Sequence, residues 1–178
     1  MKAIFQHDYG TTAAVFSAAE LDKPAPNDGE VLMQVHAAGL NAGDALIMKG
    51  KPYIARFVAG WPKPKNYIPG KDVAGVVEAV GAAVTQLTPG DEVYGEVGSS
   101  CAEYVCVKDE KLVSQPSNLS FEEAAVVPLS AVTALQGLRD AAKVLPGQKV
   151  LINGASGGVG IYAVQIAKVL DAEVTGVC

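Results

Sequence analysis

The first part of the chain alternates short apolar segments with turn-forming residues. Residues 30–37 place Val31, Met33, Val35 and Ala37 at every second position, a period that predicts a half-buried β-strand. Further strands are expected at residues 2–5, 73–80, 92–97, 104–107 and 111–114, with turns rich in Gly, Pro, Asn and Asp between them. Short strands in this succession predict a barrel or a sandwich, interrupted by one short helix at residues 42–48.

The pattern changes after residue 114. Ser120 and Glu123 have the spacing of a capping box, which predicts a helix start, and the helical stretch is disturbed at Pro128 before it resumes at residues 130–142. Apolar runs at residues 149–153 and 173–177 are typical of parallel strands covered on both faces. With helical spacing between them, these runs predict a βαβ unit. We therefore expect one domain at residues 1–118 and a second region, linker helices and the start of another domain, at 119–178.

The turn of the βαβ unit carries the strongest chemical signal. Between the first strand and the helix stand Gly154, Ala155, Ser156, Gly157, Gly158, Val159 and Gly160. In this position glycines let the backbone approach a dinucleotide pyrophosphate, whose charge faces free amides at the helix N-terminus. Gly160 would also allow close packing of the helix on the strand. The alternative is a tight turn without a ligand.

The end of the second strand indicates which dinucleotide is used. Enzymes that use NAD place an Asp or Glu about 20 residues after the glycines, where it binds the ribose 2′-hydroxyl. Here Gly176, Val177 and Cys178 bring no carboxylate to that place. Without the acid there is no repulsion against a 2′-phosphate, so we expect NADP(H), with Cys178 beside the site. The groups that hold the phosphate would follow Cys178.

Composition narrows the class of protein. The 178 residues include 14 basic and 19 acidic ones, a net charge of −5, which argues against a nucleic-acid partner. The longest apolar run, residues 124–135, is interrupted by Pro128, Ser130 and Thr133 and is shorter than the roughly 20 residues of a membrane span. The N-terminus lacks the apolar stretch of a signal peptide, and three unevenly spaced cysteines indicate no disulfide framework. We expect a cytoplasmic protein without a membrane partner.

Several blocks resemble the medium-chain dehydrogenase/reductase superfamily. Residues 70–81 (GKDVAGVVEAVG) and 89–93 (PGDEV) are similar to the signature of its GroES-like domain, and residues 39–44 and 128–135 resemble two further blocks. The nearest subfamily is that of the zinc-independent quinone oxidoreductases, which reduce quinones, enones or related carbonyl compounds with NADPH. The resemblance implies a mixed fold: a GroES-like β-barrel domain, then the first βαβ unit of a Rossmann (doubly wound α/β) domain.

Because such a domain needs two βαβ halves, we expect the chain to be a truncated N-terminal portion, inactive alone, of a protein that is a homodimer at full length. The resemblance also locates replaced zinc ligands. Where zinc alcohol dehydrogenases carry Cys, His and Cys, this chain has Asn41, Lys71 and, at or beside the third position, Leu129. None of these is a tetrahedral zinc donor, and Cys101 and Cys106 do not form the four-cysteine lobe of those enzymes, so we expect no metal.

Without zinc, a carbonyl oxygen that gains charge during hydride transfer needs hydrogen-bond donors or a positive group. Asn41 can donate from its amide, or it only ties a turn; Lys71 supplies charge if it points inward, or it is a solvated surface lysine. Asp44 orients the cofactor or caps the helix at residues 42–48. By resemblance, Thr133 lies against the nicotinamide.

Residues 50–69 form a loop rich in Pro, Lys and aromatic residues, among them Tyr53, Phe57, Trp61 and Tyr67. Loops of this length are often functional, and we expect Tyr53 and Trp61 to line a substrate pocket, with ordinary packing against the barrel as the alternative. The leading hypothesis is an NADPH-dependent reductase of a quinone, enone or other carbonyl compound. The rival hypothesis is a non-catalytic nucleotide-binding or structural protein of the same fold.

Overall fold

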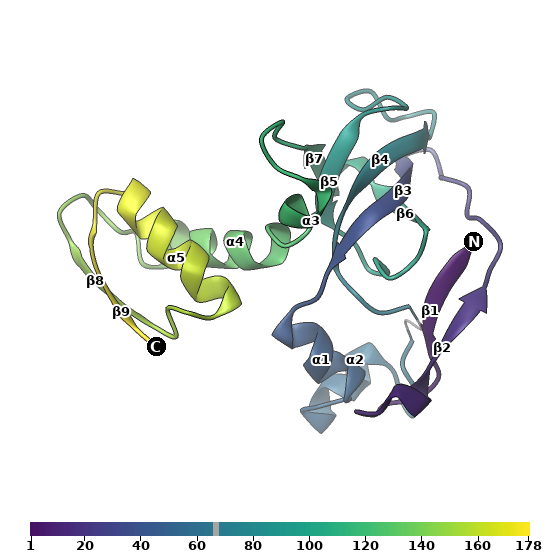
Figure 1. Ribbon diagram of the computed structural model, residues 1–178, viewed down its shortest axis with the longest axis horizontal. Helices are drawn as coiled ribbons and strands as arrows, with labels where there is room; N and C mark the ends of the chain where they lie inside the picture. Colours follow the sequence, from purple (N-terminus) through teal and green to yellow (C-terminus); the bar gives the residue numbers. More distant parts are fainter. Residues whose placement is uncertain (66–67) are drawn as a thin grey trace. The chain divides into compact units, whose positions relative to one another are not determined.

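The computed structural model describes residues 1–65 and 68–178, which form two compact units, Met1–Val126 and Val127–Cys178 (Figure 1). Each unit has its own strands and its own apolar core. The domain boundary expected after residue 118 stays a prediction, and Tyr67 lies outside the described residues. Within the described part of the chain, no helix combines the length and the hydropathy that a membrane span requires.

The main sheet of the first unit has five antiparallel strands in the order β6-β3-β4-β5-β7. The strands are β3 (Glu30–Gly39), β4 (Asp72–Val80), β5 (Glu92–Glu96), β6 (Tyr104–Lys108) and β7 (Leu112–Ser114). Two further strands, β1 (Lys2–Gln6) and β2 (Phe16–Glu20), pair antiparallel in a small separate sheet. The sequence pattern did not predict β2, because its FSAAE sequence has a single large apolar residue and so no apolar face.

The core of the first unit is formed where β3, β4 and β5 meet. Val31, Met33, Val73, Val77 and Val93 are almost completely buried there. The half-buried alternation predicted for β3 is wrong at its start, because Leu32 is buried as well. The register of β3 against β4 shifts between Leu32 and Met33, and such an irregularity breaks the strict alternation of side chains between the two faces.

Short helices connect these strands. They are a 3₁₀ turn at Ala13–Val15, α1 (Ala42–Met48), a second 3₁₀ turn (Tyr53–Ala55) that leads into α2 (Arg56–Ala59), a third at Asp109–Lys111, and α3 (Phe121–Ala124). The predicted capping box of α3 is confirmed: Ser120 Oγ accepts a hydrogen bond from the Glu123 amide at 3.2 Å, and the Glu123 carboxylate accepts one from the Ser120 amide at 2.9 Å.

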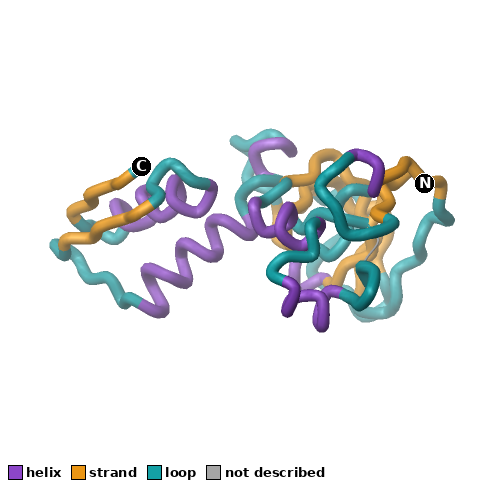
Figure 2. The backbone as a smooth tube through the Cα atoms, turned by 90° about the horizontal axis from the view of Figure 1, so that it is seen from below, coloured by secondary structure: helices purple, strands orange, loops and turns teal. Residues whose placement is uncertain are grey.

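The second unit contains the predicted βαβ arrangement. It consists of α4 (Pro128–Leu135), a π-helical turn (Gln136–Ala141), β8 (Lys149–Asn153), α5 (Gly158–Val169) and β9 (Glu173–Val177), with β8 and β9 parallel (Figure 2). The predicted interruption of the helical stretch is present, between α3 and α4, but the helix resumes at Pro128 and not at Ser130. Pro128 is the first residue of α4, a position where its missing N–H removes no helical hydrogen bond. A small core forms between α4, α5 and the strands.

Candidate functional site

The first unit contains an apolar pocket of about 450 Å³. Its volume lies in the range of about 300–1,000 Å³ that small-molecule sites usually have. Most of its wall comes from α1 and from the segment that leads into β4. The lining residues are Gln6, Asp44, Ile47, Met48, Ala59, Pro64, Lys65, Ile68, Pro69, Gly70, Lys71 and Gly98. A mostly apolar wall with a few polar groups suits a small apolar ligand whose orientation those groups determine.

Asp44, one of the predicted site residues, links the pocket to the start of α1. Its carboxylate accepts a hydrogen bond from the backbone N–H of Asn41 at 2.8 Å, as in a capping box. The side chain is buried and forms part of the pocket wall. The structure thus supports the helix-capping alternative for Asp44, and its role in orienting a cofactor stays a prediction.

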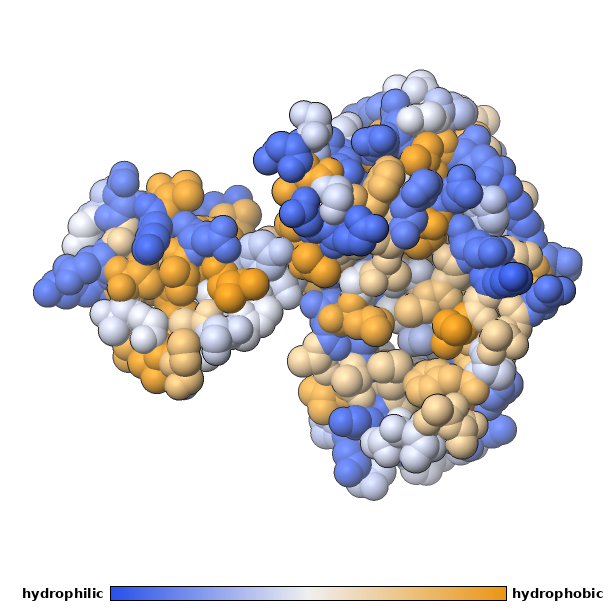
Figure 3. Space-filling model, viewed as in Figure 1, coloured by the Kyte–Doolittle hydropathy of each residue, from blue (hydrophilic) through white to orange (hydrophobic). Residues whose placement is uncertain are grey.

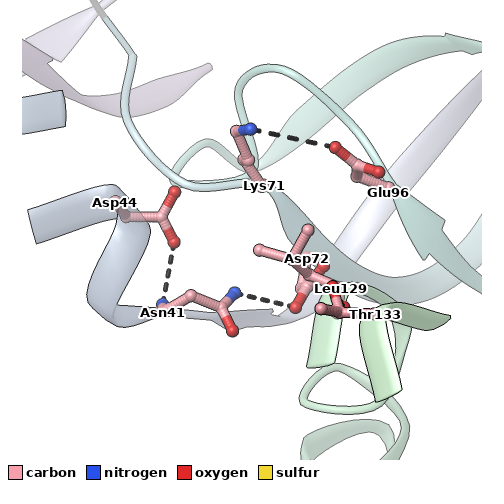
Figure 4. Close-up of polar contacts among 7 residues, drawn as sticks. All are labelled: Asn41, Asp44, Lys71, Asp72, Glu96, Leu129 and Thr133. Atoms are coloured by element: carbon pink, nitrogen blue, oxygen red, sulfur yellow. Dashed lines mark hydrogen bonds and ion pairs between the residues drawn. The ribbon is translucent and has the colours of Figure 1, made fainter. Parts of the chain in front are cut away.

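The side chain of Asn41 is held by a residue that the sequence analysis missed. Asn41 Nδ2 donates a hydrogen bond to Asp72 Oδ2 at 2.8 Å (Figure 4). Asp72 is the first residue of β4 and is 0% exposed. A carboxylate is costly to bury unless it accepts hydrogen bonds, so this contact stabilises both residues. The available signal was a charged residue immediately before the apolar run that starts at Val73.

The position of Lys71 agrees in part with both alternatives, an inward-pointing charge and a solvated surface lysine. It forms part of the pocket wall, yet its side chain is partly exposed and its Nζ is 4.0 Å from Glu96 Oε1 (Figure 4). The preceding Gly70 has a φ of +91°, and a Cβ there would come within 2.2 Å of Ser100 Oγ. Glycine is therefore required for the turn that places Lys71 at the pocket.

The half-buried Cys101 comes close to this region without being suited to nucleophilic chemistry. Burial raises the pKa of the Cys101 thiol, and the negative charge of Asp44 raises it further. A thiol with a raised pKa is protonated at neutral pH and reacts poorly. Across residues 1–65 and 68–178, no group of three or more His, Cys, Asp or Glu side chains is placed to hold a metal ion.

The two aromatic residues expected in the pocket lie elsewhere. Tyr53 and Trp61 are 64% and 66% exposed, and neither is among the residues of the pocket wall. The Tyr53 ring lies under the guanidinium of Arg56, with 4.9 Å to the ring centroid, and Trp61 stacks on Phe57 with centroids 6.1 Å apart. Both rings thus contact neighbours within residues 50–69, a segment expected to be a loop that instead contains the 3₁₀ turn Tyr53–Ala55 and α2. A contact of either ring with substrate stays a prediction.

In the second unit, the glycine turn combines close packing with open space. A Cβ at Gly160 would lie 2.0 Å from the carbonyl oxygen of Gly154 and 2.8 Å from Ala155 Cα, so only glycine lets α5 begin against the turn. A Cβ at Gly154 would meet nothing within 4 Å, and at Gly157 or Gly158 its contacts would be ordinary or only slightly tight. With the amides at the start of α5, and with Ser156 and Val159 in the same turn, this geometry fits a pyrophosphate.

The remaining predicted residues lie on either side of this turn in the sequence. Thr133 Oγ1 donates to the Leu129 carbonyl at 2.6 Å, so this donor bond stays within α4. The Val177 carbonyl accepts hydrogen bonds from the amides of Gly154 and Ala155, at 2.8 and 2.9 Å. These bonds bring the end of β9, and with it the exposed Cys178, next to the glycine turn.

The two units together define a class of protein: an antiparallel β-domain followed by a βαβ unit with a glycine turn. Residues 27–137 match the alcohol dehydrogenase GroES-like domain. The quinone oxidoreductase of Sus scrofa is 36% identical over 178 residues, which are 99% of this chain and 52% of that protein.

Among solved structures, the CurK enoyl reductase has a TM-score of 0.90 at 35% identity, covering 98% of this chain and 53% of its own. The Escherichia coli quinone oxidoreductase, solved in complex with NADPH, has a TM-score of 0.84 at 28% identity, covering 99% and 52%. This chain belongs to the medium-chain dehydrogenase/reductase superfamily and, within it, to the quinone oxidoreductase-like family. It spans about half the length of the relatives that it matches.

Proposed function

We propose that this protein is a zinc-independent, NADPH-dependent oxidoreductase that reduces a quinone, an enone or another carbonyl compound. The observation that carries the proposal is the apolar pocket, whose wall holds Asp44 and Lys71 and which adjoins the hydrogen-bonded pair of Asn41 and Asp72. Relatives that are named quinone oxidoreductase and enoyl reductase support this class of reaction.

In this proposal the βαβ unit is the first part of a Rossmann fold, and its glycine turn binds the pyrophosphate of the dinucleotide. Once bound, the reduced nicotinamide supplies a hydride. Thr133 contacts the nicotinamide ring, as the family resemblance implies. NADPH is favoured over NADH because β9 ends through Gly176 and Val177 into Cys178 without a carboxylate. The NADPH in the Escherichia coli relative agrees with this preference.

Two side chains of the first unit act on the substrate in this proposal, and a third positions one of them. The Lys71 ammonium stabilises the oxygen that gains negative charge. The Asn41 amide acts as a hydrogen-bond donor toward the same oxygen, and its orientation depends on Asp72. Asp44 accepts a hydrogen bond from the backbone N–H of Asn41 at the start of α1 and so positions the side-chain amide of Asn41. A charge and an amide would thus replace the Lewis acid of the zinc enzymes.

The proposal is tested by NADPH oxidation in the natural gene product with a panel of quinones and enones. We expect turnover with NADPH and weaker binding of NADH. Substitution of Lys71 by Met should lower kcat/KM at least about tenfold, whereas Lys111→Met, on the same unit, should leave it unchanged. Absence of turnover across the panel contradicts the substrate class, and NADPH binding in calorimetry without any turnover favours the non-catalytic alternative. Sedimentation of the same sample checks the expected homodimer, and cell fractionation checks the expected cytoplasmic location.

A further inference from the structure

The segment that builds most of the pocket wall has an unusual charge. Residues 45–71 contain six of the 14 basic residues of the chain and none of its 19 acidic ones, so this segment carries a formal +6 and the rest of the chain −11. The six cations are Lys49, Lys51, Arg56, Lys63, Lys65 and Lys71. The pocket is walled mostly by this positively charged segment, together with the buried carboxylate of Asp44, on a protein with a negative net charge.

Two of these cations, Lys63 and Lys65, are exposed, and they lie on either side of the wall residue Pro64 in the sequence. Lys65 and its neighbour Pro64 form part of the pocket wall. Neither lysine makes an ion pair with any residue in the described ranges, and the two residues outside them, Asn66 and Tyr67, carry no negative charge. The ammonium groups of Lys63 and Lys65 are thus exposed charges without a protein counterion.

The loop that bears these lysines is held by backbone hydrogen bonds. The Lys65 amide donates to the Ala59 carbonyl at 2.7 Å, and the Gly60 amide donates to the Arg56 carbonyl at 2.8 Å. The hydroxyl of Tyr9, far away in the sequence, donates to the Gly60 carbonyl at 2.7 Å. These hydrogen bonds fix the backbone of residues 59–65, the segment that carries Lys63 and Lys65. In Figure 3 the surface over α1 and α2 shows apolar side chains with hydrophilic ones at its edge.

Two acidic residues at or near the pocket, Asp44 and Glu96, make no ion pair with Lys63 or Lys65. Asp44 is buried in the pocket wall, where it accepts the hydrogen bond from the Asn41 amide. Glu96 lies 4.0 Å from the ammonium of Lys71. Of the two lysines in the pocket wall, Lys71 has Glu96 as its neighbour, whereas Lys65 makes no ion pair with any described residue.

We infer that the pocket selects an acidic substrate, namely an apolar conjugated carbonyl compound that carries a carboxylate or phosphate group. This inference rests on the proposed function and narrows its substrate class, because a simple quinone or enone has no such group. The apolar wall takes the carbonyl compound, and Lys63 and Lys65 attract its anionic group. Charges at the rim of a site act mainly through steering and selectivity, and salt screens them.

The inference can be tested by ligand binding, with Trp61 as the reporter. Trp61 is the single tryptophan of the chain and lies two residues before Lys63. The protein is titrated with 4-carboxybenzalacetone and with the corresponding carboxamide, which has nearly the same shape but no charge. We expect the carboxylate to bind about fivefold more tightly at low salt, and this advantage to shrink toward unity at about 0.5 M NaCl.

A matched pair of double variants separates the local charge from the net charge. Lys63→Gln/Lys65→Gln should abolish the preference for the carboxylate, whereas Lys2→Gln/Lys111→Gln, with the same change of charge elsewhere on the first unit, should keep it. Equal affinity of the unchanged protein for both probes, equal losses in the two double variants, or no binding of either probe would overturn the inference. Because the readout is binding, a protein that distinguishes the probes and reduces neither contradicts only the proposed reductase function.

Discussion

Strands of similar apolar character have very different surroundings in the two units. In the first unit, residues 72–75 of β4 are buried, and the strand pairs with β3 on one side and β5 on the other. In the second unit, β9 has no buried residue, and Leu151 of β8 is 69% exposed. Among the described residues, the sheet of the second unit consists of these two parallel strands. An apolar strand sequence thus permits burial, and the elements that pack against the strand determine how many of its side chains are buried.

The polar groups differ in the same way. The first unit buries Asp44 and Asp72, each with a hydrogen-bond donor from Asn41. In the second unit, Lys149 and Glu173 form an ion pair across β8 and β9, with both side chains largely exposed. A buried charge depends on its partner, whereas an exposed pair exchanges readily with water.

The largest effect is expected in the core of the first unit. Met33→Ala should lower its free energy of unfolding by about 2–5 kcal/mol, because a fully buried side chain leaves a cavity. The matched substitution in the second unit, Leu151→Ala, should change the stability of the 178-residue chain by no more than about 0.5 kcal/mol, because the side chain is exposed in it. Urea titrations that follow Trp61 fluorescence for the first unit, and hydrogen exchange of residues 149–177 for the second, measure both. Similar losses in the two variants would contradict the comparison.

The second largest effect on stability is expected when the buried carboxylate of Asp72 is removed. Asp72→Ala deprives the Asn41 side chain of a charged acceptor and should cost the first unit about 1.5–3 kcal/mol. Glu173→Gln, which breaks the exposed ion pair of the second unit, should cost at most about 0.5 kcal/mol. Asp72→Asn, which keeps an acceptor oxygen, should recover part of the loss. If Asp72→Ala proves neutral in urea titrations, the pair of Asn41 and Asp72 does not stabilise the fold.

In the second unit, the most sensitive point should be the turn rather than the strands. Gly160→Ala forces a Cβ against the Gly154 carbonyl and should destabilise this unit by about 1–3 kcal/mol. It should also weaken NADPH binding measured by calorimetry. At Gly137, in the π-helical turn, a Cβ meets nothing within 4 Å, so Gly137→Ala is the control. Equal behaviour of the two variants in hydrogen exchange would show that close packing at the turn is not required.

The smallest effect leaves stability untouched and concerns thiol reactivity. At pH 7.5 a thiol reagent should label the exposed Cys178 of the second unit before Cys101 of the first, because burial and the charge of Asp44 raise the pKa of Cys101. Raising the pH increases the thiolate fraction of Cys101 and should speed its labelling. Mass spectrometry of labelled peptides gives both rates. Earlier labelling of Cys101 would show that its thiol is neither shielded nor raised in pKa.

Much of the local structure followed from the sequence. The bounds of α1, the capping box at Ser120 and Glu123, and the two strands β8 and β9 all depend on residues a few positions apart. Such short-range patterns are visible without a fold. The unpredicted strand β2 shows the limit, because its pairing with β1 organises it while its own side chains form no apolar face.

The candidate site was predicted in part. Asn41, Asp44 and Lys71 were selected from the sequence, and the structure places Asp44 and Lys71 in the wall of one pocket. The partner of Asn41 was not foreseen, since Asp72 is 31 positions away and only the pairing of Gly39 with Asp72 across β3 and β4 brings them together. The exposure of Tyr53 and Trp61 was equally invisible, because an aromatic loop residue can face inward or outward with the same sequence.

By itself, the sequence determined the succession of strands and helices, the glycine turn, the family and the concentration of positive charge between residues 45 and 71. These depend on local spacing and on residue type. The tertiary structure alone decided that the charged segment walls an apolar pocket and that Asp44 and Asp72 are buried and hydrogen-bonded to Asn41. The physical reason is that burial and charge pairing depend on which distant segments pack together, and the spacing of residues along the chain does not contain that information.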